Sequence, residues 1–134
     1  MKRLGVHFVA LASLDLRLPK DVLYPSILND EAAQCPELET FAAVHRIARC
    51  LILVGDLKQL CCLPQSKVAA EVGLEMSLFE RFFEDVPGCP AVTLVEPHRT
   101  RPRLCEWISK RSYNSVLYCS RTAASQDRPW VEEV

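Results

Sequence analysis

Two apolar runs that stop abruptly at acidic and amide side chains constrain the fold of this sequence most. Residues 50–54 read Cys-Leu-Ile-Leu-Val, and Gly-Asp-Leu-Lys-Gln follows them. Residues 24–29 form a second run, weakened by a proline and a serine, and Asp-Glu-Ala-Ala-Gln follows it. A strand that is apolar throughout is typical of a parallel sheet with both faces covered. The two runs therefore predict parallel strands whose carboxyl ends open into a ligand site.

The rest of the chain alternates between strand and helix patterns. Pro36 suits a first helical turn, Gly73 suits a helix end, and Ser77 with Glu80 has the spacing of a capping box. This alternation predicts an α/β layer fold around a parallel sheet. The expected strands are 5–11, 24–29, 50–54 and 91–95, the expected helices are 36–48, 66–72, 78–85 and 102–113, and 14–20 is expected to be a loop.

The composition is that of an ordinary globular domain. The chain has 134 residues, of which 49% are hydrophobic and 25% are charged, so it fits one domain with a fair core. Its net charge of −1 provides no basic field for nucleic acid. This argues against RNA or DNA binding by the chain alone, although a motor protein contacts its strand across a groove shared by two domains.

The seven cysteines form no recognisable framework. No C-x-x-C pair occurs, and the only close neighbours, Cys61 and Cys62, are adjacent. Because zinc sites use paired ligands at short spacing, we expect no zinc. An odd number of thiols without a framework favours reduced cysteines, and hence a cytoplasmic or nuclear protein.

The N-terminal residues allow two interpretations. Residues 1–13 mimic a secretory signal with a small-residue cleavage site, but the apolar region is short and His7 interrupts it. A buried sheet strand explains the same residues. No apolar run approaches the length of a transmembrane helix, so we expect no membrane partner.

Four segments, in this order and spacing, resemble the superfamily 1B helicases of the up-frameshift and senataxin type. The resemblance covers roughly residues 24–119. Asp-Glu-Ala-Ala-Gln at 30–34 is similar to the Walker B box (motif II), Gly-Asp-Leu-Lys-Gln-Leu at 55–60 to motif III, 73–81 to the segment that follows motif III, and 94–102 stands in the place of motif IV.

The resemblance implies a RecA-like P-loop NTPase core that is incomplete in this sequence. No G-x-x-x-x-G-K-[ST] loop occurs, so no segment of the sequence is predicted to cradle phosphates. Residues 1–95 would be the C-terminal part of a first motor domain with motifs II and III, and 96–119 would hold motif IV and the junction to a second one. Residues 120–134 are polar and are expected to be disordered. A fragment, a partial gene model and a decayed copy all fit this pattern.

In the family that the chain resembles, the motif II acids act on ATP and Mg²⁺. By that resemblance Asp30 would lie in the Mg²⁺ shell, Glu31 would polarise the attacking water, and Gln34 would contact the nucleotide. Asp56 would anchor the motif III loop beside the nucleotide. The alternative is a strand end capped by acids that also start the next helix. Asn29 stands where the family has an apolar residue, which could weaken the strand.

Two further residues would complete the site by the same resemblance. Gln59 matches the glutamine that senses the γ-phosphate, where an amide can donate and accept hydrogen bonds at once. Arg99 matches the motif IV arginine, whose guanidinium would neutralise charge on the transferred phosphoryl group. The alternative is that Arg99 belongs, with Arg101 and Arg103, to a solvated basic loop. We expect Arg101 and Arg103 themselves to be surface charge.

Two functions follow as expectations. The first is a segment of an ATP-dependent helicase that acts on RNA or DNA through a complete core, together with the missing motor regions or other proteins, and is inactive alone. The second is a non-enzymatic α/β module, derived from a helicase, that serves protein interaction. RNA and DNA remain equal alternatives as substrates.

Overall fold

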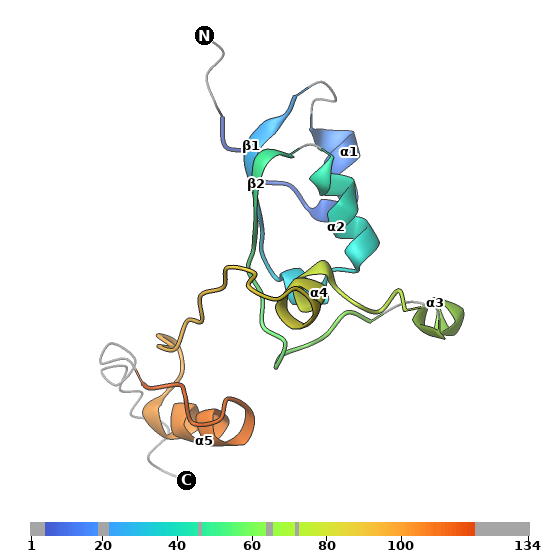
Figure 1. The fold of residues 1–134 in the computed structure, drawn as a ribbon. Coiled ribbons are helices and arrows are strands. Elements are labelled where there is room, and N and C mark those ends of the chain that lie inside the picture. Colours follow the sequence, from blue (N-terminus) through green and yellow to red (C-terminus); the bar gives the residue numbers. More distant parts are fainter. Residues whose placement is uncertain (1–4, 19–21, 46, 64–65, 72, 120–134) are drawn as a thin grey trace, which may run out of the picture. The chain divides into compact units, whose positions relative to one another are not determined.

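The computed structural model describes residues 5–18, 22–45, 47–63, 66–71 and 73–119 (Figure 1). The chain divides into two compact units, residues 1–89 and residues 90–134, which are described separately. The first unit contains η1 (Leu11–Ser13), α1 (Leu14–Arg17), β1 (Tyr24–Asn29), η2 (Ala32–Gln34), α2 (Glu37–Val44), β2 (Ile47–Leu53), α3 (Lys67–Glu71) and α4 (Leu78–Asp85), and the second contains α5 (Pro102–Ser112).

Strands β1 and β2 pair in parallel, as the sequence predicts. Leu28 lies beside Ile52 and Asn29 beside Leu53, and the register is irregular near Tyr24, where Pro25 removes a backbone donor. The ladder continues past the strands, because the N–H of Val54 donates to the carbonyl of Asn29 at 2.9 Å. Asn29 therefore does not interrupt the strand. The two carboxyl ends lie side by side, with their polar sequences directly beyond them.

One face of the β1–β2 pair is covered by short helices. Helices α1 and α2 lie on this side (Figure 1), and Leu14, Leu18 and Ala43 form a small core. Partly buried hydrophobic residues pack against that core, including Tyr24 and Ile27 of β1.

The opposite face of the pair is exposed. Leu28 and Ile52 lie side by side there, and 61% and 45% of their surfaces are accessible. Val54, two residues beyond Ile52, is 39% accessible. From the apolar strand sequences we expected helices to cover both faces of the sheet. That expectation is wrong for the described residues, because their helices cover one face only. A doubly buried pattern needs a second layer of helices.

Two expected strands are absent from the described residues. Residues 5–10 are irregular, and η1 and α1 occupy positions where we expected a strand end and a loop. Residues 91–95 are also irregular, although the carbonyl of Val95 accepts the N–H of Tyr118 at 3.0 Å. Both runs have the right apolar content. A strand also needs a neighbour that continues the ladder along its length, and neither run has one in the described chain.

The helix predictions are largely confirmed. Helix α4 covers the expected span, and α5 ends at Ser112. Helix α2 ends at Val44 instead of near residue 48, because β2 begins at Ile47 and pairs with β1 from Tyr24 onward. Sheet pairing therefore overrides helix propensity at the α2–β2 junction. The predicted tail from residue 120, and the expected end of the α3 region at residue 72, lie outside the described residues.

The backbone of Gly73 agrees with its predicted role at the end of a helix. Gly73 has a φ of +79°, and its N–H donates to the carbonyl of Ala70 at 2.9 Å, as expected for a residue that ends a helix. Among the described residues, no helix has the length and apolar character to cross a membrane.

Candidate functional site

The turn after β1 holds the predicted motif II acids. Glu31 has a φ of 54° and a ψ of 35°, a left-handed conformation that non-glycine residues rarely adopt. The side chain of Asp30 stabilises this turn, since its Oδ1 accepts the N–H of Glu31 at 3.0 Å. The conformation turns the chain from β1 into η2. Both carboxylates are exposed at the carboxyl end of the strand.

Gln34 fixes the carboxylate of Glu31. Its Nε2 donates to Glu31 Oε2 at 2.9 Å, and its backbone N–H donates to the carbonyl of Glu31 at the same distance. The two residues are three apart on η2, so both contacts form within one turn. The contact restricts the Glu31 side chain through one carboxylate oxygen, Oε2.

The loop after β2 is organised by Asp56. Its Oδ1 accepts the N–H of Lys58 at 2.9 Å, and its Oδ2 accepts Nε2 of Gln59 at 2.8 Å. The carbonyl of Asp56 also accepts the N–H of Gln59 at 3.3 Å. Asp56 therefore anchors this loop and sets the position of the Gln59 amide. Gln59 itself is exposed.

Gly55 allows the two turns to approach each other. A Cβ added at this position would lie 2.8 Å from the backbone nitrogen of Ala33 and 3.3 Å from its Cβ. Next to it, the N–H of Ala32 donates to the carbonyl of Val54 at 2.7 Å. The structure thus brings the motif II turn against the motif III loop. Parallel strands that end side by side predict that these two turns lie close together, and the structure agrees. The specific contact of Gly55 with Ala33 was not part of that prediction, although a glycine directly after an apolar strand is its signal in the sequence.

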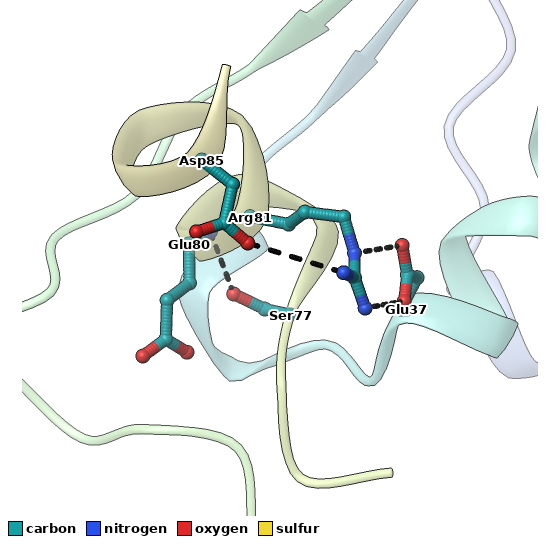
Figure 2. Close-up of polar contacts among 5 residues, drawn as sticks. All are labelled: Glu37, Ser77, Glu80, Arg81 and Asp85. Atoms are coloured by element: carbon teal, nitrogen blue, oxygen red, sulfur yellow. Dashed lines mark hydrogen bonds and ion pairs between the residues drawn. The ribbon is translucent and has the colours of Figure 1, made fainter. Parts of the chain in front are cut away.

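Helix α4 packs against η2 and α2, and an ion pair joins it to α2 (Figure 2). Arg81 forms a two-pronged ion pair with Glu37 at the start of α2, in which Nε to Oε1 and Nη2 to Oε2 are both 2.7 Å. This contact raises the pKa of Arg81, first through the hydrogen bond and then through the charge of Glu37. The two residues lie 44 positions apart, so no local sequence pattern indicates the pair.

Ser77 caps α4 and also joins it to the start of α2. Its Oγ accepts the N–H of Glu80 at 3.0 Å, which confirms the predicted helix cap, and the residue is fully buried. Pro36 and Ser77 form an isolated antiparallel bridge, and the N–H of Glu37 donates to the carbonyl of Met76 at 3.1 Å. The chain that follows motif II is therefore held against the chain that follows motif III.

Arg99 belongs to the second unit. It is exposed and lies in a bent segment two residues before Arg101, which is the N-cap of α5. Arg101 is half-buried, and its Nη2 is enclosed with no hydrogen-bond partner, so the expectation that it is plain surface charge is wrong. Arg103 is exposed, as expected.

The donor set of the strand-end site suits a magnesium ion shared with phosphate. No group of three or more His, Cys, Asp or Glu side chains that could hold a metal occurs among the described residues. Mg²⁺ usually binds one or two carboxylates together with substrate phosphates and water, and an exposed Asp30 at a strand end can supply one such ligand. The residues present therefore fit Mg²⁺ that arrives with a nucleotide.

Comparison with known proteins identifies the family of this site. A family model described as an AAA domain matches residues 13–67. The ATP-dependent helicase NAM7 of Saccharomyces cerevisiae is 33% identical over 115 residues, which is 82% of this chain and 12% of that protein. The ATP-dependent helicase upf1 of Schizosaccharomyces pombe is 34% identical over 114 residues, 81% of this chain and 12% of that protein.

The helicase sen1 of Schizosaccharomyces pombe is 32% identical over 103 residues, 77% of this chain and 6% of that protein. The chain belongs to the superfamily 1B helicases of the up-frameshift and senataxin type. It spans about an eighth or less of the length of these relatives. The family resemblance drawn from motifs II, III and IV is thereby confirmed. The roles of individual residues stay predictions.

Proposed function

We propose that this chain forms the hydrolysis side of the ATP site in the motor core of a helicase. The observation that supports this most directly is the approach of two polar turns at the carboxyl ends of β1 and β2, which the absence of a side chain at Gly55 allows. Ligands of open α/β sheets bind in this place. The names of the relatives describe ATP-dependent helicases, which fits the same site.

Each polar residue has a role that its contacts permit. Gln34 restrains Glu31, so that the carboxylate can accept a proton from a water aligned with the γ-phosphate. Asp30 would hold Mg²⁺, which supplies neutralising charge between the phosphates when it is bound. Asp56 positions the amide of Gln59, and that amide can donate to a phosphate oxygen and accept from the attacking water.

Arg99 would supply the remaining positive charge. Its guanidinium is exposed and can form two parallel hydrogen bonds with phosphate oxygens. A cation placed at the transferred phosphoryl group stabilises the charge that develops there. We assign Arg99 this role on the basis of its motif and its exposure.

The site needs a phosphate-cradling loop that the sequence lacks. We propose that the exposed face of β1–β2, with Leu28, Ile52 and Val54, packs against the remainder of a RecA-like domain that carries this loop. RNA or DNA would be bound by the complete core, since this chain has a net charge of −1. On this proposal the isolated chain does not hydrolyse ATP.

A chimera tests the proposal. The aligned segment of the Saccharomyces helicase is replaced by this chain, and ATP turnover is measured beside nucleotide affinity. We expect the chimera to hydrolyse ATP, and Glu31→Gln to lower turnover by about 10²–10⁴-fold while ATP binding is kept, because the amide cannot accept the proton of the water. The same change at exposed Glu71 of α3 should leave turnover unaffected.

The outcome separates the two candidate functions. A chimera that folds and binds ATP but keeps full turnover with Glu31→Gln would show that the motif II turn is only a strand end. A folded chimera without turnover would favour the non-enzymatic module. The exposed apolar face of β1–β2 is the feature that would then serve protein interaction.

A further inference from the structure

The segment that follows α5 turns back and lies against this helix. Ser109 connects the two, because its Oγ donates to the carbonyl of Leu117 at 2.9 Å and accepts the N–H of Leu117 at 3.0 Å. Four residues back along a helix is about 6 Å, and two residues forward along an extended chain is about 6.6 Å. These steps lead from Ser109 to Cys105 and from Leu117 to Cys119. The geometry therefore places the two cysteines beside each other.

The contacts of the two thiols agree with this placement. The thiols of Cys105 and Cys119 lie close enough to interact, and both line one pocket of about 360 Å³. Cys119 Sγ also donates to the carbonyl of Thr100 at 3.9 Å. Cys105 is only 2% exposed, whereas Cys119 is half-buried. A small thiol reagent would therefore reach Cys119 first.

We propose that Cys105 and Cys119 form a reversible disulfide that fastens α5 to the segment after it. Both residues are thiols in the structure. Two thiols already held in contact need little chain movement to bridge, and they form the bond at a high effective concentration. The oxidant that we assign is a small-molecule disulfide of the glutathione type. The proposal concerns the second unit alone and does not depend on ATP hydrolysis.

The reaction proceeds by two thiol–disulfide exchanges. The thiolate of Cys119 attacks one sulfur of glutathione disulfide, the S–S bond breaks, and one glutathione leaves. The thiolate of Cys105 then attacks Sγ of Cys119 and releases the second glutathione. In total, two protein thiols lose two electrons and two protons, and glutathione disulfide becomes two glutathione thiols. Burial raises the pKa of the Cys105 thiol, so the second exchange should become faster as the pH rises.

Oxidation has a structural consequence near Arg99. A disulfide has no S–H group, so the hydrogen bond from Cys119 to the carbonyl of Thr100 is lost. Thr100 directly follows Arg99. The redox state of the pair would thus alter the anchoring of the Arg99 segment. A consequence for ATP turnover rests on the role proposed for Arg99 above, whereas formation of the disulfide does not.

The experiment uses the complete chain in glutathione redox buffers. After acid quenching and alkylation, trypsin places Cys105 in the peptide 104–110 and Cys119 in the peptide 112–121, so the linked pair has a unique mass. We expect the equilibrium for the linked pair to be at least about tenfold more favourable in the native chain than in denaturant, where only the 13-residue tether of residues 106–118 brings the thiols together.

Two variants test whether the disulfide is specific to Cys105 and Cys119. Cys50→Ser removes an exposed thiol of β2 and should leave the linked fraction unchanged. Cys119→Ser should leave Cys105 reduced, because its neighbour is gone and it is buried. Equal equilibria in the native and denatured chain would overturn the proposal. Recovery of Cys119 as a glutathione adduct beside reduced Cys105 in the native wild-type chain would also overturn it.

Discussion

The turn after β1 and the segment around Arg99 present their chemical side chains in different ways. In the first unit, Glu31 is held by Gln34, and Gln59 is held by Asp56, through hydrogen bonds of 2.8–2.9 Å within each turn. In the second unit, Arg99 is exposed, and it is the neighbouring carbonyl of Thr100 that accepts a hydrogen bond.

Mutations in these two regions should therefore affect stability and chemistry differently. The strand-end residues share contacts with the backbone that forms the fold, so changes there should affect stability and chemistry together. Arg99 contributes a cation without such contacts in the described chain. We therefore expect its chemistry to be separable from stability, because a side chain that supports no structure can be removed at little structural cost.

Among the changes that test this comparison, replacement of Arg99 by alanine should have the largest effect. In the helicase chimera we expect turnover to fall by about 10²–10³-fold, because stabilisation of transition-state charge is lost. The melting temperature of the chimera should not change. Arg103→Ala removes another exposed arginine, in the first turn of α5, and serves as the control. Unchanged turnover in the Arg99 variant would identify a solvated basic loop and break the comparison.

Gly55→Ala tests how far the stability of the first unit depends on the close approach of its two turns. The added Cβ would lie 2.8 Å from the backbone nitrogen of Ala33, so the two turns must separate. We expect a loss of about 3 kcal/mol in the free energy of unfolding, measured by urea denaturation of the isolated chain.

The matched control for this change is Gly88→Ala. Gly88 has a φ of +75° and open space around its Cβ position, so the cost should be conformational only, about 1 kcal/mol. Equal losses in the two variants would mean that the approach of the motif II and motif III turns does not limit stability.

Ser77→Ala measures how much the N-terminal cap of α4 contributes to the stability of the fold. Loss of the cap to the N–H of Glu80 should lower the free energy of unfolding by about 1 kcal/mol. Ser13 precedes α1 and makes no side-chain cap, so Ser13→Ala should cost less. Thermal or urea unfolding of both variants checks the order, and the reverse order would contradict the role assigned to Ser77.

The smallest effect is expected at the surface of α5. A hydrogen bond from Lys110 at 2.7 Å, and then the charge of Lys110, lowers the pKa of Glu106 below its ordinary value of 4.5. Because the folded pKa is the lower one, the contribution to stability is present above pH 4.5 and is lost as the pH falls through the lowered value.

A carboxyl titration by NMR measures this shift. Lys110→Met should return the pKa of Glu106 to its ordinary value, while the overall stability changes little because both side chains are 66% exposed. An identical titration in the variant would show that the ion pair does not persist in solution.

Local sequence signals predicted the elements that depend on nearby residues. The cap at Ser77, the first turn of α5 at Pro102 and the helix end at Gly73 are each decided within one or two turns of chain. The strand pair β1–β2 was also predicted, because the apolar runs are strong and their polar ends coincide. Runs 5–11 and 91–95 had the same apolar content but found no ladder to join in the described chain.

The sequence by itself determined the family, the parallel strand pair and the identity of the polar residues at its carboxyl end. These follow from residue types and from short spacings, which local geometry converts into turns and strands. Only the tertiary structure decided that Gly55 packs against Ala33. The same holds for the ion pair of Arg81 with Glu37, 44 positions apart, and for the placement of Cys105 beside Cys119. Contacts between residues far apart in sequence depend on how whole elements pack, and no local pattern encodes that packing.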